Sequence, residues 1–251
     1  MKTLPLSLLF VIGLVAYQPG YQNNQIRKAN IKRVTSLVGI TMKQKFVSDY
    51  DQRGNLIRRV GYGSDGSSLL HETYKYDAKD NLVEAVMGGQ KRTYSYRYNN
   101  AGQVLEARQF YAEGKLRERA ELRHDGSGNM IEQSRFGANG NLLERQLNTY
   151  QVHNVVSQTL IYGPDGNLTS RITYEYEGDR LSRKSTYGAN GNLVRRNVYK
   201  RDQKGLVIED LQTNEKGELV DRTTSEYEFY PQPISLLEEV RERLPSIGRS
   251  T

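Results

Sequence analysis

The chain of 251 residues carries a net charge of +7 and no cysteine, which excludes disulfides, thiolate metal sites and cysteine nucleophiles. Hydrophobic residues make up 36%, with 18 tyrosines and no tryptophan, which is too little apolar material for the core of a two-sheet sandwich of this size. Lys and Arg alternate with Glu and Asp, as in Arg117-Glu118-Arg119. Such mixing indicates a solvated surface and argues against a nucleic-acid partner.

Residues 1–20 have the pattern of a secretory signal peptide. Lys2 precedes an apolar run from Leu4 to Ala16 that is too short to span a membrane. A polar linker, residues 21–30, follows. We therefore expect export to the periplasm, outer surface or medium of a bacterium, with no transmembrane span after signal removal. The alternatives for the apolar run are a buried strand or an uncleaved anchor.

Residues 31–230 are predicted to form one repeat domain, in which a phrase recurs from Tyr50 to about Glu218. We call it the Tyr-Asp phrase, and its fullest form runs from Tyr50 to Leu56. The phrase begins with an aromatic slot. Successive occurrences of this slot are 26, 22, 26, 26, 26 and 25 residues apart, a period of roughly 25 that is typical of repeat proteins. The slot is filled by Tyr50, Tyr76, Tyr98, His124, Tyr150, Tyr176 and Arg201. A second phrase falls midway, with Tyr62, Phe110, Phe136, Tyr162, Tyr187 and Thr213 in the matching slot. Each period therefore contains two turns.

The segments between these turns are predicted to be strands, because they are rich in β-branched and aromatic residues and bounded by Gly, Asn and Asp. The segment Gly163-Pro164-Asp165-Gly166 predicts a three-residue hairpin loop closed by a glycine bulge. Roughly 14 such turns predict about 15 antiparallel strands in one meander. The segment from Ile31 to Met42 is expected to add a strand or two at its start. The predicted fold is an all-β hairpin meander forming a curved, elongated, single-layer sheet that is partly closed on one face.

Strand parity predicts which side chains share a face. Two examples are the sets Leu142, Glu144, Gln146, Asn148, Tyr150 and Val104, Glu106, Arg108, Phe110. One face would then hold apolar groups at both strand ends and a polar strip between them. Aromatic and Leu side chains that meet across each turn would form two apolar ladders on this face.

Residues 231–251 break the repeat. Ser235-Leu-Leu-Glu238 resembles a capping box and predicts a short helix that ends before Pro245. We expect this helix to cover the last sheet edge, since an open edge invites unwanted pairing.

Tyrosines are the candidate ligand-binding residues, because each offers an apolar ring and a polar tip. The strip consists of Tyr74, Tyr76, Tyr94, Tyr96, Tyr98, Tyr174 and Tyr176. The alternative is that these side chains only pack one hairpin against the next.

No catalytic or metal-binding set is evident. His71, His124 and His153 are expected to be structural, and the segment from Asp125 to Asn129 is expected to be a plain turn because Met130 replaces the Gly of a calcium loop. Carboxylates recur along the polar strip at Glu84, Glu106, Glu118, Glu132 and Glu144. A glycosidase would use paired carboxylates, but cross-strand pairing with Arg58, Arg108, Arg183 and Arg195 explains them more simply. We expect no metal and no cofactor.

The Tyr-Asp phrase resembles the YD repeat of the RHS and teneurin families, over about Ile31 to Tyr230. The resemblance rests on the segments 50–56, 76–82 and 124–130, and it implies successive hairpins in a spiralling sheet. The chain is far shorter than the shell-forming members and has neither their terminal core motif nor a toxin domain after Tyr230. It resembles short exported envelope proteins sometimes described as sugar-binding. The Gly-Asn-Leu phrase is also similar to MORN repeats, but the Tyr-Asp pairing favours the YD repeat.

The leading functional hypothesis is an exported, non-enzymatic binding or scaffold module of the cell envelope, with a surface polysaccharide or an envelope protein as its partner. A long repeated surface and the lack of a catalytic set motivate it. The alternatives are a polysaccharide-acting enzyme that uses the Glu strip, and a purely structural envelope component.

Overall fold

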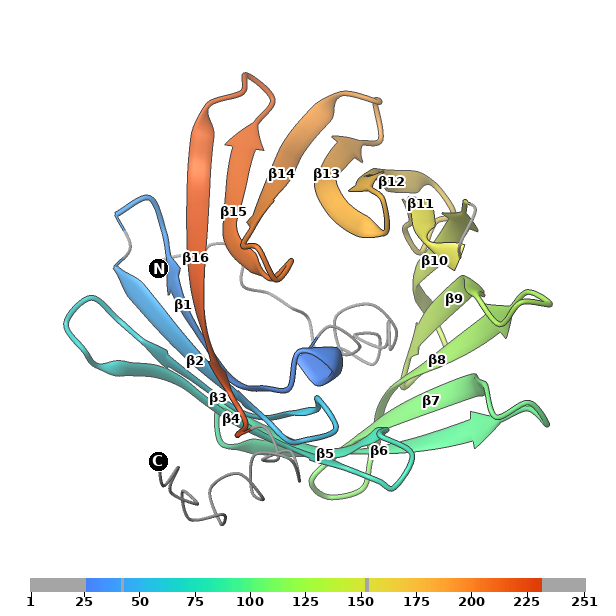
Figure 1. Cartoon of the computed structure of the whole chain (residues 1–251). Helices are drawn as coiled ribbons and strands as arrows, with labels where there is room; N and C mark the ends of the chain where they lie inside the picture. Colours follow the sequence, from blue (N-terminus) through green and yellow to red (C-terminus); the bar gives the residue numbers. More distant parts are fainter. Residues whose placement is uncertain (1–25, 42, 152–153, 232–251) are drawn as a thin grey trace, which may run out of the picture.

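The computed structural model describes residues 26–41, 43–151 and 154–231. Within this part of the chain, sixteen antiparallel strands follow one another, and β1 also pairs with β16, so that the wall closes into a barrel (Figure 1). The strands are β1 (Ile31–Val38), β2 (Gln44–Tyr50), β3 (Leu56–Tyr62), β4 (Ser68–Tyr76), β5 (Leu82–Met87), β6 (Gln90–Tyr98), β7 (Val104–Tyr111), β8 (Leu116–His124), β9 (Met130–Gly137), β10 (Leu142–Tyr150), β11 (Val156–Tyr162), β12 (Leu168–Glu177), β13 (Arg180–Gly188), β14 (Leu193–Arg201), β15 (Val207–Asn214) and β16 (Leu219–Phe229).

The hairpin meander is confirmed, and the expected extra strand at its start is β1. Residues 26–28 form one helical turn before it. The predicted signal peptide and the predicted helix after Ser235 lie outside the described residues. None of the described segments forms a helix long and apolar enough to cross a membrane.

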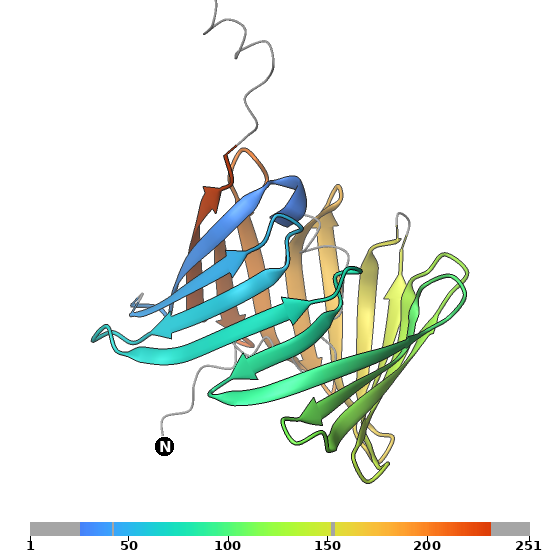
Figure 2. The same cartoon turned by 90° about the horizontal axis from the view of Figure 1, so that it is seen from below.

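The prediction of an open, curved sheet is wrong, because β1 and β16 pair along their length from Val38 opposite Thr223 to Ile31 opposite Phe229. Backbone bonds continue beyond the strands, since the Tyr230 amide donates to the Asn30 carbonyl at 2.9 Å. Closure satisfies the two strand edges that an open sheet would leave unpaired. In Figure 2 the strands of the near wall cross those of the far wall at a large angle, as tilted strands do around a barrel.

The turn chemistry follows the prediction. Gly54 has φ of 84° and its amide donates to the Asp51 carbonyl at 2.9 Å, which closes a three-residue loop. The Asp51 carboxylate accepts from the amides of Arg53 and Asn55 at 2.9 and 2.8 Å. The Asp of the Tyr-Asp phrase is thus the side chain that fixes the turn.

The parity prediction is wrong, because an extra residue follows nearly every turn. Tyr98 lies opposite Val104 whereas Arg97 lies opposite Glu106, so that Leu105 is a β-bulge. Val104 and Glu106 therefore lie on opposite faces of the wall. The same shift separates Leu142 from Glu144 on β10.

The bulges divide the two apolar ladders between the faces of the wall. The turns of the Tyr-Asp phrase gather at one end of the barrel, the Tyr-Asp rim, and their Tyr and Leu side chains lie on one face. This face holds most of the buried side chains, which identifies it as the concave inner face, where side chains converge. Its largest cluster contains Tyr74, Ala85, Tyr94, Val104, Ala107, Ala120 and Leu122. The aromatics of the second phrase lie near the opposite rim on the outer face.

Ion pairs cover the outer face near the Tyr-Asp rim. The Glu84 carboxylate lies 2.8 Å from the Lys75 Nζ and 2.7 Å from the Lys91 Nζ, on the two neighbouring strands. Glu132 lies between Arg123 and Arg145 in the same way, at 2.8 and 2.7 Å. Asp49, Glu106 and Glu209 also each pair with two cations.

Cross-strand charge pairing is therefore confirmed for Glu84 and Glu132, but the placement of the Glu strip on one face is wrong. Glu84, Glu106 and Glu132 lie on the outer face. Glu118 and Glu144 lie on the inner face, where both pair with Arg135, at 3.2 and 3.5 Å. Among the described residues, only Arg108 of the arginines predicted as partners pairs with one of these glutamates, Glu106 of its own strand. Arg58 and Arg183 pair instead with Asp49 and Glu175.

These pairs predict a loss of stability in acid. Bonds from Lys75 and Lys91 lower the pKa of Glu84 to about 2, and Arg145 and Lys200 lower the pKa of Glu132 and Glu209 respectively. A depressed folded pKa contributes stability that is present above the ordinary value of 4.5 and is lost as the pH falls below it. We expect the Tm to stay level from pH 7 to 5 and to fall from about pH 4.5 to 2. A Tm that is unchanged over this range would contradict the expectation.

Candidate functional site

The inner tyrosines join strands where their pairing stops before the rim. We call each such unpaired end of a hairpin a seam. In each hairpin of the second phrase, strand pairing stops short of the Tyr-Asp rim; β3 and β4, for example, are last paired at Arg58 opposite Thr73. The carbonyl of Leu56 lies beyond this point and has no strand partner on that side. The Tyr76 hydroxyl donates to it at 2.9 Å, so that Tyr76 joins the two strands where their ladder ends.

The same bond recurs around the barrel. Donor and acceptor are 20 residues apart, except across the shortened repeat, where the separation is 14. Besides Tyr76, the hydroxyls of Tyr96, Tyr150, Tyr176 and Tyr227 donate to the carbonyls of Leu82, Met130, Val156 and Val207 at 2.8, 2.9, 2.8 and 2.5 Å. At the closure of the barrel, Tyr230 donates to the carbonyl of Tyr50 at 2.6 Å. The repeat therefore encodes a set of tyrosine ties across the seams.

The seven candidate tyrosines all lie on the inner face, in two groups. Five lie together on β4 and β6, and the other two, Tyr174 and Tyr176, lie on β12. Within the larger group, Tyr74 donates to Glu72 at 2.6 Å and Tyr94 accepts from Gln109 at 2.8 Å. The Lys79 Nζ lies 4.9 Å from the centre of the Tyr98 ring.

These hydroxyls are therefore engaged within the protein. Tyr174 shares a 3.3 Å hydrogen bond with Thr159, and Tyr98 packs against Tyr96 with ring centres 6.3 Å apart. Burial raises the pKa of Tyr74 and Tyr76, which keeps their hydroxyls protonated as donors. Contact between the ring faces and a ligand remains a prediction.

Two seams depart from the rule. His124 fills the tyrosine slot on β8, and its Nδ1 is buried without a hydrogen-bond partner among the described residues. Burial lowers the pKa of His124, so the ring is neutral at pH 7. Arg201 fills the slot on β14 and donates to the carbonyls of Leu181 and Gly205 at 2.8 and 3.0 Å. A guanidinium thus replaces the tyrosine hydroxyl at this seam.

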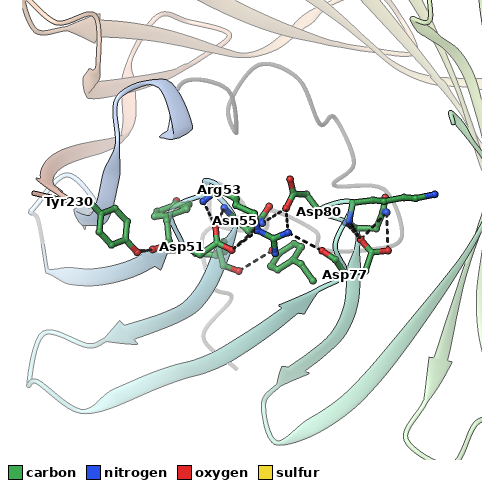
Figure 3. A network of polar contacts seen from close by, with 11 residues as sticks. Asp51, Arg53, Asn55, Asp77, Asp80 and Tyr230 are labelled. Carbon is green, nitrogen blue, oxygen red and sulfur yellow. Dashed lines mark hydrogen bonds and ion pairs between the residues drawn. The ribbon is translucent and has the colours of Figure 1, made fainter. Parts of the chain in front are cut away.

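Polar side chains link successive turns along the Tyr-Asp rim (Figure 3). Asn55 is 2% exposed, and its Nδ2 donates to Asp51 of its own turn at 3.1 Å and to Asp80 of the next at 2.8 Å. Arg53 pairs with the same Asp80 carboxylate at 2.9 Å. Asp80 has φ of 64°, in the position that glycine fills in most turns. The network sets the spacing of neighbouring turns.

The seam between β13 and β14 opens into a cleft. Pairing of these strands is last seen at Arg183 opposite Val198, short of the rim. The cleft has a volume of about 540 Å³ and is lined by Glu177, Arg180, Ser182, Tyr199, Lys200 and Arg201. It is the seam in which arginine stands in the tyrosine slot.

The β13–β14 hairpin also concentrates positive charge. Residues 180–201 contain seven Lys and Arg and no Asp or Glu. The expectation that Lys and Arg are mixed with acidic residues is wrong for this segment, because an average over the chain conceals it. A window of about 20 residues would have revealed it from the sequence.

Two of these cations face the inside of the barrel. Lys184 lies opposite Tyr174 and Asn197, and Arg195 lies on the next strand, opposite Thr186. The Arg195 Nε is buried without a hydrogen-bond partner in the described residues. Burial, and secondly Arg195, lowers the pKa of Lys184.

The other candidate groups do not line this cleft. His71 is exposed on the outer face, and His153 lies outside the described residues. The Asp125 carboxylate accepts from the amides of Ser127 and Asn129, both at 2.9 Å, as expected for a plain turn. In the described part of the chain, no group of three His, Asp or Glu side chains could hold a metal ion.

No protein-family model and no curated protein matches the chain. Among solved structures, the barrel is similar to porin-like proteins from Bacteroides uniformis and Bacteroides vulgatus. The first is 12% identical over 79% of this chain and 98% of its own, with a TM-score of 0.38; the second is 10% identical over 80% and 99%, with a TM-score of 0.43. A similarity to TcdB2-TccC3 covers 68% of this chain and 14% of that one, at 14% identity and a TM-score of 0.18. Membership of the RHS or YD-repeat family stays a prediction.

The tyrosine ties predict a specific cost of hydroxyl removal. Tyr76→Phe leaves the Leu56 carbonyl without its donor, and we expect a loss of about 1 kcal/mol in the free energy of unfolding, measured with urea. Tyr162→Phe on the outer face is the control, because its hydroxyl has no hydrogen bond within the described residues. Equal losses in the two variants would contradict the proposed tie.

The exception at β8 predicts the opposite effect. His124→Tyr places a hydroxyl in the slot that lies 20 residues after Val104, where the other ties are made. We expect the free energy of unfolding to rise by about 0.5–1.5 kcal/mol. His71→Tyr, on the outer face, should change it much less. A destabilised His124→Tyr variant would show that this seam differs in geometry from the others.

Proposed function

We propose that the protein is an exported barrel of the bacterial cell envelope that binds a surface glycan or an envelope protein and catalyses no reaction. The observation that carries this proposal is the wall itself, which is a closed and rigid scaffold with an inner surface of tyrosines and polar groups. Such a surface offers rings and hydrogen-bonding groups for recognition. We propose that the repeat is of the YD type.

The charges of the wall support contact with water on both faces. Ion pairs such as Glu84 with Lys91 lie on the outer face, and Arg135 with Glu118 lies on the inner face. Lipid would be a poor solvent for such side chains, although the cost for an Arg or Lys depends on depth, about 2–4 kcal/mol at the middle of a bilayer and about 0–1 kcal/mol near its surface. Arg108 and Arg119 lie opposite each other near the middle of β7 and β8 on the outer face, where the cost would be high. We therefore place the barrel in an aqueous compartment of the envelope or outside the cell.

The Glu strip is a weak candidate for glycosidase chemistry. A general acid needs a raised pKa, whereas Lys75 lowers the pKa of Glu84 to about 2 and Arg145 lowers that of Glu132. Glu118 is occupied by Arg117 and Arg135. These carboxylates are better described as parts of the ion-paired wall.

A binding function predicts retention of an envelope component. The immobilised protein should retain a glycan or protein from envelope extract in detergent-free buffer, and should bind members of a glycan array. Retention of nothing, with a deletion strain of altered envelope integrity, would favour a purely structural protein. Turnover of a polysaccharide that Glu106→Gln and Glu132→Gln abolish would favour the enzyme.

A further inference from the structure

We infer that the β13–β14 seam is a binding site for an acidic glycan, whose carboxylate or sulfate groups are held by Arg180, Lys184, Arg195 and Arg201. This inference rests on the proposed binding function and names the ligand class and its place on the wall. It depends on the substitution of arginine for tyrosine in one slot of the repeat.

At this seam a cation, Arg201, takes the place of the tyrosine that joins the strands at most other seams. Arg201 holds the Leu181 carbonyl at 2.8 Å, so the two strands remain joined as they are by tyrosine elsewhere. Arg180 lies beside it, because a Cβ at Gly205 would be 2.6 Å from the guanidinium carbon of Arg180. Arg201 in turn donates to the Gly205 carbonyl at 3.0 Å. Two guanidinium groups therefore meet at one glycine, at the mouth of the cleft.

These cations of the seam lack carboxylate partners and lie together, whereas Arg92, an inner-face cation on β6 that also has a buried Nε without a partner among the described residues, lies away from this cleft. One carboxylate, Glu177, lines the cleft and lies opposite Arg180 on β12. No ion pair joins Arg180, Lys184, Arg195 or Arg201 to a carboxylate in the described part of the chain, whereas Arg183 and Lys200 of the same hairpin pair with Glu175 and Glu209. Asp210 faces the inner side and attracts Lys184 and Arg195 electrostatically, but its hydrogen bond is to Asn197, at 2.9 Å. Arg180 is exposed, whereas Lys184, Arg195 and Arg201 are partly buried. A partly buried cation without an ion pair costs stability, and an anionic ligand would reduce that cost.

The pKa directions agree with this geometry. Burial and the neighbouring Arg195 lower the pKa of Lys184, while burial raises the pKa of Asp210. Both shifts indicate charges held where water solvates them poorly. Such electrostatic conflict is typical of functional sites.

The arrangement of the cations along the seam favours a chain-like ligand. Lys184 lies four residues from Arg180, which is about 13 Å along a strand, so the cations form two levels between the rim and the inner face. Tyr199 lines the cleft and lies on the inner face of β14, between these levels. A tyrosine ring flanked by cations suits a sugar ring that carries an acidic group. A duplex nucleic acid requires an exposed basic surface, not a confined seam.

The test uses two sets of substitutions in the full chain. Arg201→Tyr restores the slot residue of the other repeats, so the fold should be kept while a cation is lost. Lys184→Gln with Arg195→Gln removes the inner pair. Lys45→Gln with Lys115→Gln is the control, because both are exposed cations away from the seam, on β2 and in the β7–β8 turn, and this pair removes the same charge as the inner pair. Thermal unfolding of each variant verifies that the barrel is intact.

Binding is measured by calorimetry with polygalacturonate, dextran sulfate and neutral dextran. We expect wild-type protein to bind an acidic polymer and not dextran, with polygalacturonate and dextran sulfate distinguishing carboxylate from sulfate ligands. Arg201→Tyr and the inner double variant should each raise the Kd about tenfold or more, while the control stays within about twofold. Equal weakening in the control would show diffuse charge attraction and overturn the inference.

Two further outcomes separate the inference from the proposed function. Tighter binding of a single-stranded 20-nucleotide DNA than of either acidic polymer would overturn the inference in favour of nucleic acid. If the seam variants still retain the same envelope component as wild type, the seam is not the site, although the protein remains a binding module. If wild type retains no envelope component and binds no polymer, both statements fail.

Discussion

A strand pair whose ladder stops short of the rim leaves a carbonyl without a strand partner, and a buried carbonyl needs a donor. In this barrel the donor is a tyrosine hydroxyl of the next repeat, as between Tyr150 and Met130 at 2.9 Å. Donor and acceptor belong to the two strands of one hairpin of the second phrase, so each bond joins these strands at the point where their ladder ends. The tyrosines must face inward to make these bonds, which is why the inner face is aromatic near the Tyr-Asp rim. The repeat phrase is conserved within the chain because every hairpin meets the same local need.

The two faces of the wall are stabilised differently. On the outer face, exposed ion pairs contribute little individually, about 0–1 kcal/mol each, and depend on salt and pH. On the inner face, buried side chains such as Ala85 and Ala120, both 0% exposed, are packed under tyrosine rings. Polar groups there are costly unless paired, so an unpaired cation on this side is informative in a way that one on the outer face is not. Lys184 and Arg195 meet this condition as neighbours beside a cleft, whereas Arg92 meets it away from that cleft and the exposed Lys45 does not meet it.

Most of the architecture follows from the sequence, because most glycines with positive φ are placed by the repeat. Gly54 and Gly166 mark loops that the chain alone identifies. The distribution of side chains between faces does not follow, since Leu105 and Leu143 are bulges and parity counting cannot detect a shift of register.

Closure of the barrel does not follow from the sequence either. The β1 segment lies before the repeat, and its pairing with β16 depends on the curvature of all the strands between. The 20-residue spacing of the Tyr and Leu slots contains the tyrosine ties, but the same slots equally predict packing partners across a turn, because sequence spacing does not show which strands meet. The basic seam was visible in the sequence and was lost in the average composition.

The pairing of β1 with β16 has a consequence for how such a protein can change in size. An open solenoid gains or loses repeats at little cost, because its diameter is independent of length. In a closed wall, duplication of one period adds two strands, which lengthens the circumference by about 9–10 Å and widens the interior by about 3 Å. A half period would bring the last strand back in the wrong direction for antiparallel closure. The width of the interior can therefore change only by whole periods of two strands. A gene duplication within the repeat would change which molecules fit inside.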